Sequence, residues 1–209
     1  MKNYEKHADT QFKIHDLLEG RWSPRAYSNQ PVEAEKLLSV FEAARWSPSG
    51  GNSQPWSFVV GTQNEPATFK NIVDALAPGN QIWAKDVPVL IVAIAQTKRP
   101  DNGALNPYAL YDVGQAVAHL SVQAEAVGLV VHQMAGFDAA KMRQVLNLPD
   151  DFEPVTVAAV GYQGDLNQLP PPLREREVAP RTRKPLDAFV FEGVWQQPLT
   201  HAVEPATGD

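Results

Sequence analysis

The sequence predicts a single domain in which helices cover both faces of a β-sheet. Runs rich in β-branched and aromatic residues alternate along the chain with stretches in which apolar residues recur every three or four positions. One run, residues 87–95, lacks polar alternation, which is typical of a strand buried on both faces. The 209 residues show no internal repeat and no second-domain boundary, so we expect one domain over residues 1–209.

The first half of the chain contains two of the expected strands and three of the expected helices. The helix at 32–46 is the clearest, because Leu37, Phe41 and Ala44 share one face and glutamates occupy the first turn. Residues 1–11 are polar and are expected to form a flexible tail. The other elements are strands at 56–61 and 87–95, a short helix at 14–20, and a helix that begins at Pro66.

The second half contains the longest predicted helix, at 108–127, which Gly128 closes. A strand at 129–131, a helix from Asp138 to Asn147 and a strand at 155–162 are expected to follow. Residues 170–180 are rich in proline and charge, and we expect a connector there. Residues 185–195 alternate loosely like an edge strand, which would be costly to leave exposed, so we expect this segment to dock on a neighbour.

Composition excludes several classes of function. A formal net charge of -6 and a pI near 5.4 argue against nucleic acid or an anionic membrane as the main partner. The absence of cysteine excludes disulfides, thiolate catalysis and Cys-ligated metal sites. The N-terminus has no apolar run that would act as a secretory signal, and residues 87–95 are too few to span a bilayer. We therefore expect a soluble, cytoplasmic protein without membrane or nucleic-acid partners.

Three polar stretches stand out as candidate ligand contacts. Small and polar residues fill the loop between Pro48 and Pro55, so its backbone N–H groups could approach a ligand closely, although an ordinary turn has the same composition. Arg21, Ser23 and Arg25 alternate onto one side of an extended segment. A late pair, Arg181 and Arg183, alternates in the same way. The alternative for these arginines is ordinary surface solvation, and the charge run at 174–177 fits that description.

Together these stretches resemble the FMN-dependent nitroreductase family, in which an Arg-x-Ser-x-Arg/Lys segment, a Pro-Ser-x-x-Asn-x-Gln-Pro-Trp loop and a late basic pair contact one flavin mononucleotide. The resemblance extends from about residue 17 to residue 195. It implies an α+β fold, a three-layer α-β-α sandwich with a mixed central sheet. It also implies an intertwined homodimer with flavin sites at the interface, in which a C-terminal extension, 185–209, reaches over the partner subunit.

The resemblance also implies where each part of the flavin is held. Positive charge from Arg25 near N1 and the C2 carbonyl would stabilise the reduced, anionic flavin. Small residues before Asp138 would let a backbone N–H approach N5, while a plain strand-to-helix turn explains them equally well. The implied FMN contacts are Arg21, Trp22, Ser23, Arg25, Pro48, Ser49, Gly50, Asn52, Gln133, Met134, Ala135, Gly136, Arg181 and Arg183, with the residues between 48 and 52 coming from the partner subunit.

The implied activity is that of an FMN-dependent oxidoreductase that takes hydride from NADPH or NADH and passes it to a nitroaromatic, a quinone or a similar small molecule in a ping-pong cycle. The flavin performs the chemistry, so no catalytic residue and no metal site is expected. Residues 97–111 are expected to line the acceptor pocket. A non-catalytic FMN store or sensor is the alternative, with Trp22 or Trp83 blocking the ring face.

Overall fold

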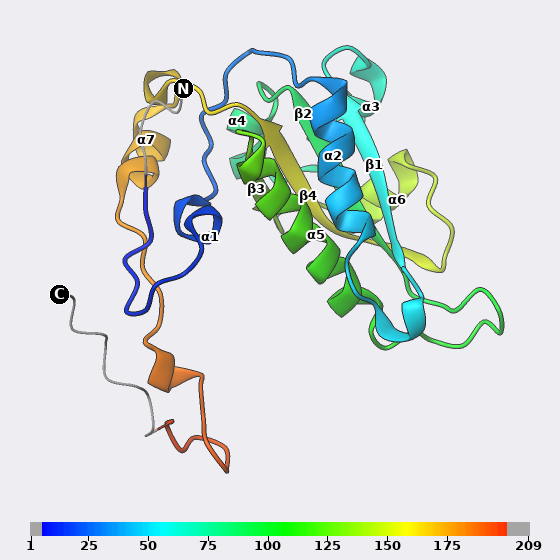
Figure 1. Cartoon of the computed structure of the whole chain (residues 1–209). Helices are drawn as coiled ribbons and strands as arrows, with labels where there is room; N and C mark the ends of the chain where they lie inside the picture. Colours follow the sequence, from blue (N-terminus) through cyan, green and yellow to red (C-terminus); the bar gives the residue numbers. More distant parts are fainter. Residues whose placement is uncertain (1–5, 200–209) are drawn as a thin grey trace.

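A four-stranded sheet forms the centre of the computed structural model, which describes residues 6–199 (Figure 1). Its strands are β1 (Trp56–Thr62), β2 (Val89–Gln96), β3 (Val130–Met134) and β4 (Phe152–Gly161), in the spatial order β1-β2-β4-β3. All three pairings are antiparallel, so the expectation of a mixed sheet is wrong. Strands β2 and β3 point the same way, but β4 inserts between them and prevents a parallel pair.

Helices lie on both faces of this sheet. A core on one face joins β2, β3 and β4 to α3, α4 and α6, whereas α2 and α5 pack on the other face. No helix within residues 6–199 combines the length and apolar character needed to cross a bilayer. The helices are α1 (Asp16–Gly20), α2 (Ala34–Arg45), α3 (Pro66–Ala75), α4 (Pro78–Ala84), α5 (Ala109–Ala126), α6 (Ala139–Val145) and α7 (Pro171–Val178), with single 3₁₀ turns at Gly50–Asn52, Leu166–Gln168 and Leu186–Ala188.

Strand β2 shows why its sequence lacks polar alternation. Val92 and Ile94 belong to the core shared with α3, α4 and α6, while Val89 and Ile91 belong to the core shared with α2 and α5. Successive side chains of a strand point to opposite faces, and both faces of this central strand are covered. The strand predicted at 87–95 and its burial on both faces are therefore confirmed.

Two predictions near the C-terminus are wrong. The expected connector at 170–180 contains α7, because Pro171 and Pro172 occupy the first helical turn, where a missing N–H group costs nothing. The expected edge strand at 185–195 is absent: a 3₁₀ turn is followed by an isolated bridge between Phe191 and Pro198. Residues 1–5 of the predicted tail and residues 200–209 of the predicted extension lie outside the described residues.

The extended segment 21–27 is fixed against the sheet near β4. Tyr27 forms a bridge with Gln163, and its hydroxyl donates to the carbonyl of Ala159 at 3.1 Å. A Cβ atom at Gly164 would lie 2.3 Å from the carbonyl carbon of Tyr27 and 2.8 Å from the nitrogen of Ser28. Only glycine therefore permits this close approach of two backbones.

Candidate functional site

The segment that carries the first arginines alternates as the sequence predicts. Trp22 and Ala26 are buried, whereas Arg21, Ser23 and Arg25 are partly exposed on the opposite side. The ring of Trp22 is only 7% exposed and lies under the ammonium of Lys6, with Nζ 4.7 Å from the ring centroid. The Trp22 side chain thus packs behind the segment, and the arginines share its open side.

Arg21, Arg181 and Arg183 form a cationic cluster at this open side. Burial lowers the pKa of Arg21, and the charge of Arg183 lowers it further. Burial also lowers the pKa of Arg181, with added repulsion from Arg21 and Arg183. The Nη1 atom of Arg181 donates to the carbonyls of Lys6 (2.6 Å) and Glu19 (2.7 Å), which fixes the side chain. The carboxylate of Glu125 offsets part of this repulsion. Three guanidinium groups beside one carboxylate leave a net positive charge, which favours an anion with several acceptor oxygens.

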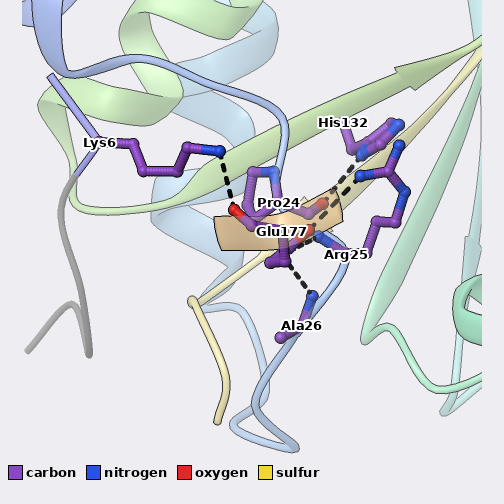
Figure 2. Close-up of polar contacts among 6 residues, drawn as sticks. All are labelled: Lys6, Pro24, Arg25, Ala26, His132 and Glu177. Carbon is purple, nitrogen blue, oxygen red and sulfur yellow. Dashed lines mark hydrogen bonds and ion pairs between the residues drawn. The ribbon is translucent and has the colours of Figure 1, made fainter. Parts of the chain in front are cut away.

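The second arginine of this segment, Arg25, lies in a partly buried network around the carboxylate of Glu177 (Figure 2). Its backbone N–H donates to Oε1 of Glu177 at 2.6 Å, and its Nη1 lies 3.4 Å from Oε2 of the same carboxylate. Nearby, His132 of β3 contacts the carbonyl oxygen of Pro24 through Nδ1 at 2.9 Å. Burial, followed by the charge of Arg25, lowers the pKa of His132 to about 4, so this ring is neutral at physiological pH.

The stretch from Gln133 to Gly136 continues β3 alongside this segment. Gln133 is exposed and its Nε2 donates to Oγ of Ser121 on α5 at 3.0 Å, whereas Met134 is buried. The carbonyl of Gly136 accepts from Nδ2 of Asn80 at 3.0 Å, and a Cβ atom at Gly136 would lie 2.9 Å from that nitrogen. Sequence reasoning did not assign a contact within residues 80–85, although the Pro78 that opens this helix could have predicted α4.

The loop from Pro48 to Asn52 has a defined shape held by side chains. The N–H of Gly50 donates to Oδ2 of Asp112 at 3.1 Å, and the N–H of Gln54 donates to Oγ of Ser49 at 3.0 Å. Gly51 and Asn52 both have positive φ angles, 58° and 55°, which glycine and asparagine tolerate best. This is more than a generic surface turn, because a buried carboxylate organises its backbone.

Helix α5 separates the loop from the arginine cluster within one chain. Asp112 holds the loop at the first turn of α5, while Glu125 in the last turn lies beside Gly20 and Arg21. These positions are 13 residues apart (112 to 125), which corresponds to about 20 Å along a helix. Within one chain, Arg21 therefore lies near Arg181 and Arg183, and β3 contacts the same segment through His132 and Pro24, whereas the 48–52 loop is held at the other end of α5.

The sequence model of the Nitroreductase family matches residues 18–162, which is more than half of the chain. This chain belongs to the nitroreductase family. The residues matched by the family model include the sheet, the 21–25 segment, the 48–52 loop and the 133–136 stretch. The match ends before α7 and Arg181.

Solved and curated relatives agree with membership of the nitroreductase family. A structure described as an oxidoreductase containing FMN is 33% identical, with a TM-score of 0.85, and covers 94% of this chain and 100% of its own. NADH dehydrogenase from Thermus thermophilus is 27% identical over 69% of this chain and 84% of its own length. Iodotyrosine deiodinase from Nematostella vectensis is 25% identical over 85% of this chain and 74% of its own length.

Proposed function

We propose that this protein is an FMN-dependent NAD(P)H oxidoreductase that reduces nitroaromatics, quinones or similar small acceptors. The observation that carries the proposal is the cluster of Arg21, Arg181 and Arg183, since three guanidinium groups fit the dianionic phosphate of FMN. FMN would supply the redox chemistry, taking hydride from NADPH or NADH and passing it to an acceptor in a ping-pong order.

The residues of this chain divide between the two ends of the cofactor. Arg21, Ser23, Arg181 and Arg183 would hold the phosphate. Arg25, which lies further along the same side of the segment, would place its charge near the flavin ring and favour the reduced, anionic form. The Gln133–Gly136 stretch would lie against the ring. For Trp22 we expect contact with FMN through the backbone only, because its side chain is buried.

A homodimer would complete the site. The loop residues Pro48, Ser49, Gly50 and Asn52 would come from a second copy, because α5 holds the loop about 20 Å from the arginines of its own chain. Large apolar side chains are exposed on the two helices of that face, including Leu38 (68%) and Tyr111 (67%), and Trp46 directly after α2 is 74% exposed. Exposed apolar area of this kind favours a protein partner, and the exposed C-terminal segment with Phe189 and Trp195 extends away from the sheet (Figure 1).

The alternative of an FMN store or sensor has less support. It requires a group that covers the ring face, and the notable candidates were Trp22 and Trp83. Both rings are buried, and Trp83 packs between Tyr27 and His132 in the core. Burial of both rings therefore gives this alternative no support.

An anaerobic spectral titration tests the proposal. We expect the purified protein to bind FMN and turn yellow, to bleach when NADPH or NADH is added, and to recover its colour with a nitroaromatic or a quinone. An iodotyrosine belongs in the acceptor panel, because a deiodinase matches most of this chain. Arg21→Ala should abolish FMN binding at micromolar concentrations, whereas Arg176→Ala, which removes an exposed charge from α7, should not. A wild-type protein that fails to take up FMN would refute the proposal.

A further inference from the structure

Glu177 is a fully buried carboxylate in the last turn of α7. Its Oε1 accepts from the backbone N–H groups of Arg25 (2.6 Å) and Ala26 (3.2 Å), and its Oε2 lies 3.4 Å from Nη1 of Arg25. The ammonium of Lys6 donates to the Glu177 carbonyl at 2.7 Å. Figure 2 shows the contacts of Arg25 and Ala26 meeting at the carboxylate, whereas Lys6 reaches the backbone carbonyl of Glu177 from the N-terminal segment.

Attaching a helix through a buried charge carries a large desolvation cost. Removing a carboxylate from water costs several kcal/mol unless partners repay it, and an apolar or neutral side chain often tethers an element equally well. Here the backbone N–H groups of Arg25 and Ala26 would hold α7 equally well through any hydrogen-bond acceptor of the same shape at position 177. The negative charge faces the guanidinium of Arg25, with which it forms an ion pair, and it also acts on the ammonium of Lys6.

The guanidinium of Arg25 is restrained but not buried by this contact. Its side chain is 27% exposed, whereas the side chain of Glu177 is 0% exposed. The pair therefore presents a cation toward the open side of the segment and keeps its counter-charge behind it. His132 also lies beside Arg25, and because it is neutral above acidic pH it adds no charge to this arrangement.

We propose that Glu177 is a positioning residue that fixes Arg25 and offsets part of its positive charge, so that the site favours reduced FMN less strongly than an isolated arginine would. The inference rests on the proposed function. A cation near the flavin stabilises its reduced, anionic form, and a carboxylate directly behind that cation weakens the stabilisation. Glu177 thereby sets how readily the bound flavin gives up its electrons to an acceptor.

Glu177→Gln tests the proposal because glutamine keeps an acceptor for the two backbone N–H groups and removes the charge. The measurement is the midpoint potential of bound FMN relative to free FMN, which gives the ratio of affinities for the reduced and oxidised forms. We expect this ratio to rise about tenfold, which equals about 30 mV for a two-electron couple. The matched control is Glu175→Gln, which removes an exposed charge from the same helix and should leave the ratio within about twofold.

A folded Glu177→Gln protein whose ratio matches wild type would overturn the inference and leave Glu177 as a tether alone. If Glu177→Gln does not fold, Arg25→Gln is compared with the double variant Arg25→Gln/Glu177→Gln, in which no buried charge is left unpaired. The double variant should have the higher ratio, and equal ratios would again refute the charge effect. Wild-type protein that binds no FMN would refute the proposed function instead, so the two failures are distinguishable.

Discussion

The carboxylate of Asp112 accepts a hydrogen bond from the backbone N–H of Gly50 at 3.1 Å. Asp112 is only 2% exposed, although it is a charged residue in the first turn of α5. Its Oδ2 therefore fixes the loop from Pro48 to Asn52 at the start of the helix. Tyr108 packs from the same turn, with its ring 3.5 Å from the place a Cβ atom of Gly50 would occupy.

Asp112→Ala should loosen this loop without unfolding the protein. Loss of one charged hydrogen bond corresponds to about 1.5–3 kcal/mol, so we expect FMN affinity to fall about tenfold or more in a fluorescence-quenching titration. Asp150→Ala is the control, because it removes a fully exposed carboxylate whose ion pair with Arg143 lies at the surface. Equal FMN affinity in the Asp112→Ala protein and in wild type would show that the loop does not contact the cofactor.

Arg25→Ala should slow reduction of bound FMN more than it weakens FMN binding. The charge acts on the reduced form, so we expect stopped-flow reduction by NADPH or NADH to slow about tenfold or more, while the dissociation constant of oxidised FMN changes only about threefold. An unchanged reduction rate would count against the electrostatic role. Arg176→Ala, on the exposed side of α7, controls for the loss of one positive charge.

Stability should fall as the pH is lowered, because His132 is buried in its neutral form. Burial and the charge of Arg25 lower the pKa of His132 from 6.5 to about 4. Between these pH values the unfolded chain binds more protons, so the free energy of unfolding falls as the pH drops from 6.5 to 4, by up to about 3 kcal/mol, and is unaffected above that window. Urea unfolding of the protein without added cofactor at pH 7.5, 5.5 and 4.5 measures this slope.

If His132 causes this dependence of the free energy of unfolding on pH, removing its imidazole ring should remove most of the dependence. His132→Gln should be less stable at every pH, and its stability should vary less across this window than that of the wild type. Equal slopes in the His132→Gln protein and in wild type would assign the acid sensitivity to other groups.

Gly164→Ala should destabilise the fold strongly. The new Cβ atom would lie 2.3 Å and 2.4 Å from the carbonyl carbon and oxygen of Tyr27, and backbone atoms cannot rotate away as a flexible side chain can. We expect a loss of more than about 3 kcal/mol in urea unfolding, or failure to fold. Gly79→Ala is the matched control, since no atom lies within 4 Å of its Cβ position in α4, and it should be neutral or slightly stabilising. A melting curve for Gly164→Ala that overlays wild type would contradict this account.

The sequence predicted the elements whose apolar pattern is strong. All four strands were expected near their observed positions, as were the long helix α5 and the cap of α6, where Asp138 accepts from the N–H of Lys141 at 2.9 Å. The alternation of Arg21, Ser23 and Arg25 was also correct, because period two follows directly from extended backbone. These features depend on local pattern, which a single sequence contains in full.

Features that depend on packing were missed. Charge runs usually lie in water, so Glu177 was grouped with its exposed neighbours, and only the fold shows the two N–H groups that bury it. The strand order was equally hidden, because insertion of β4 between β2 and β3 is decided by which edges meet, not by the residues of one strand. No contact could be assigned to Asn80 from the sequence, because its partner, the carbonyl of Gly136, is 56 residues away.

The position of α5 between the loop and the arginines has a genetic consequence. If each cofactor cavity takes its arginines from one subunit and its loop from the other, two inactive proteins complement each other. An Arg21→Ala subunit mixed with an Asn52→Ala subunit would form hybrids in which one cavity carries both lesions and the other carries none. On this proposal such hybrids would regain up to half of the activity per dimer, so two defective gene copies in one cell would together restore the activity that each alone abolishes.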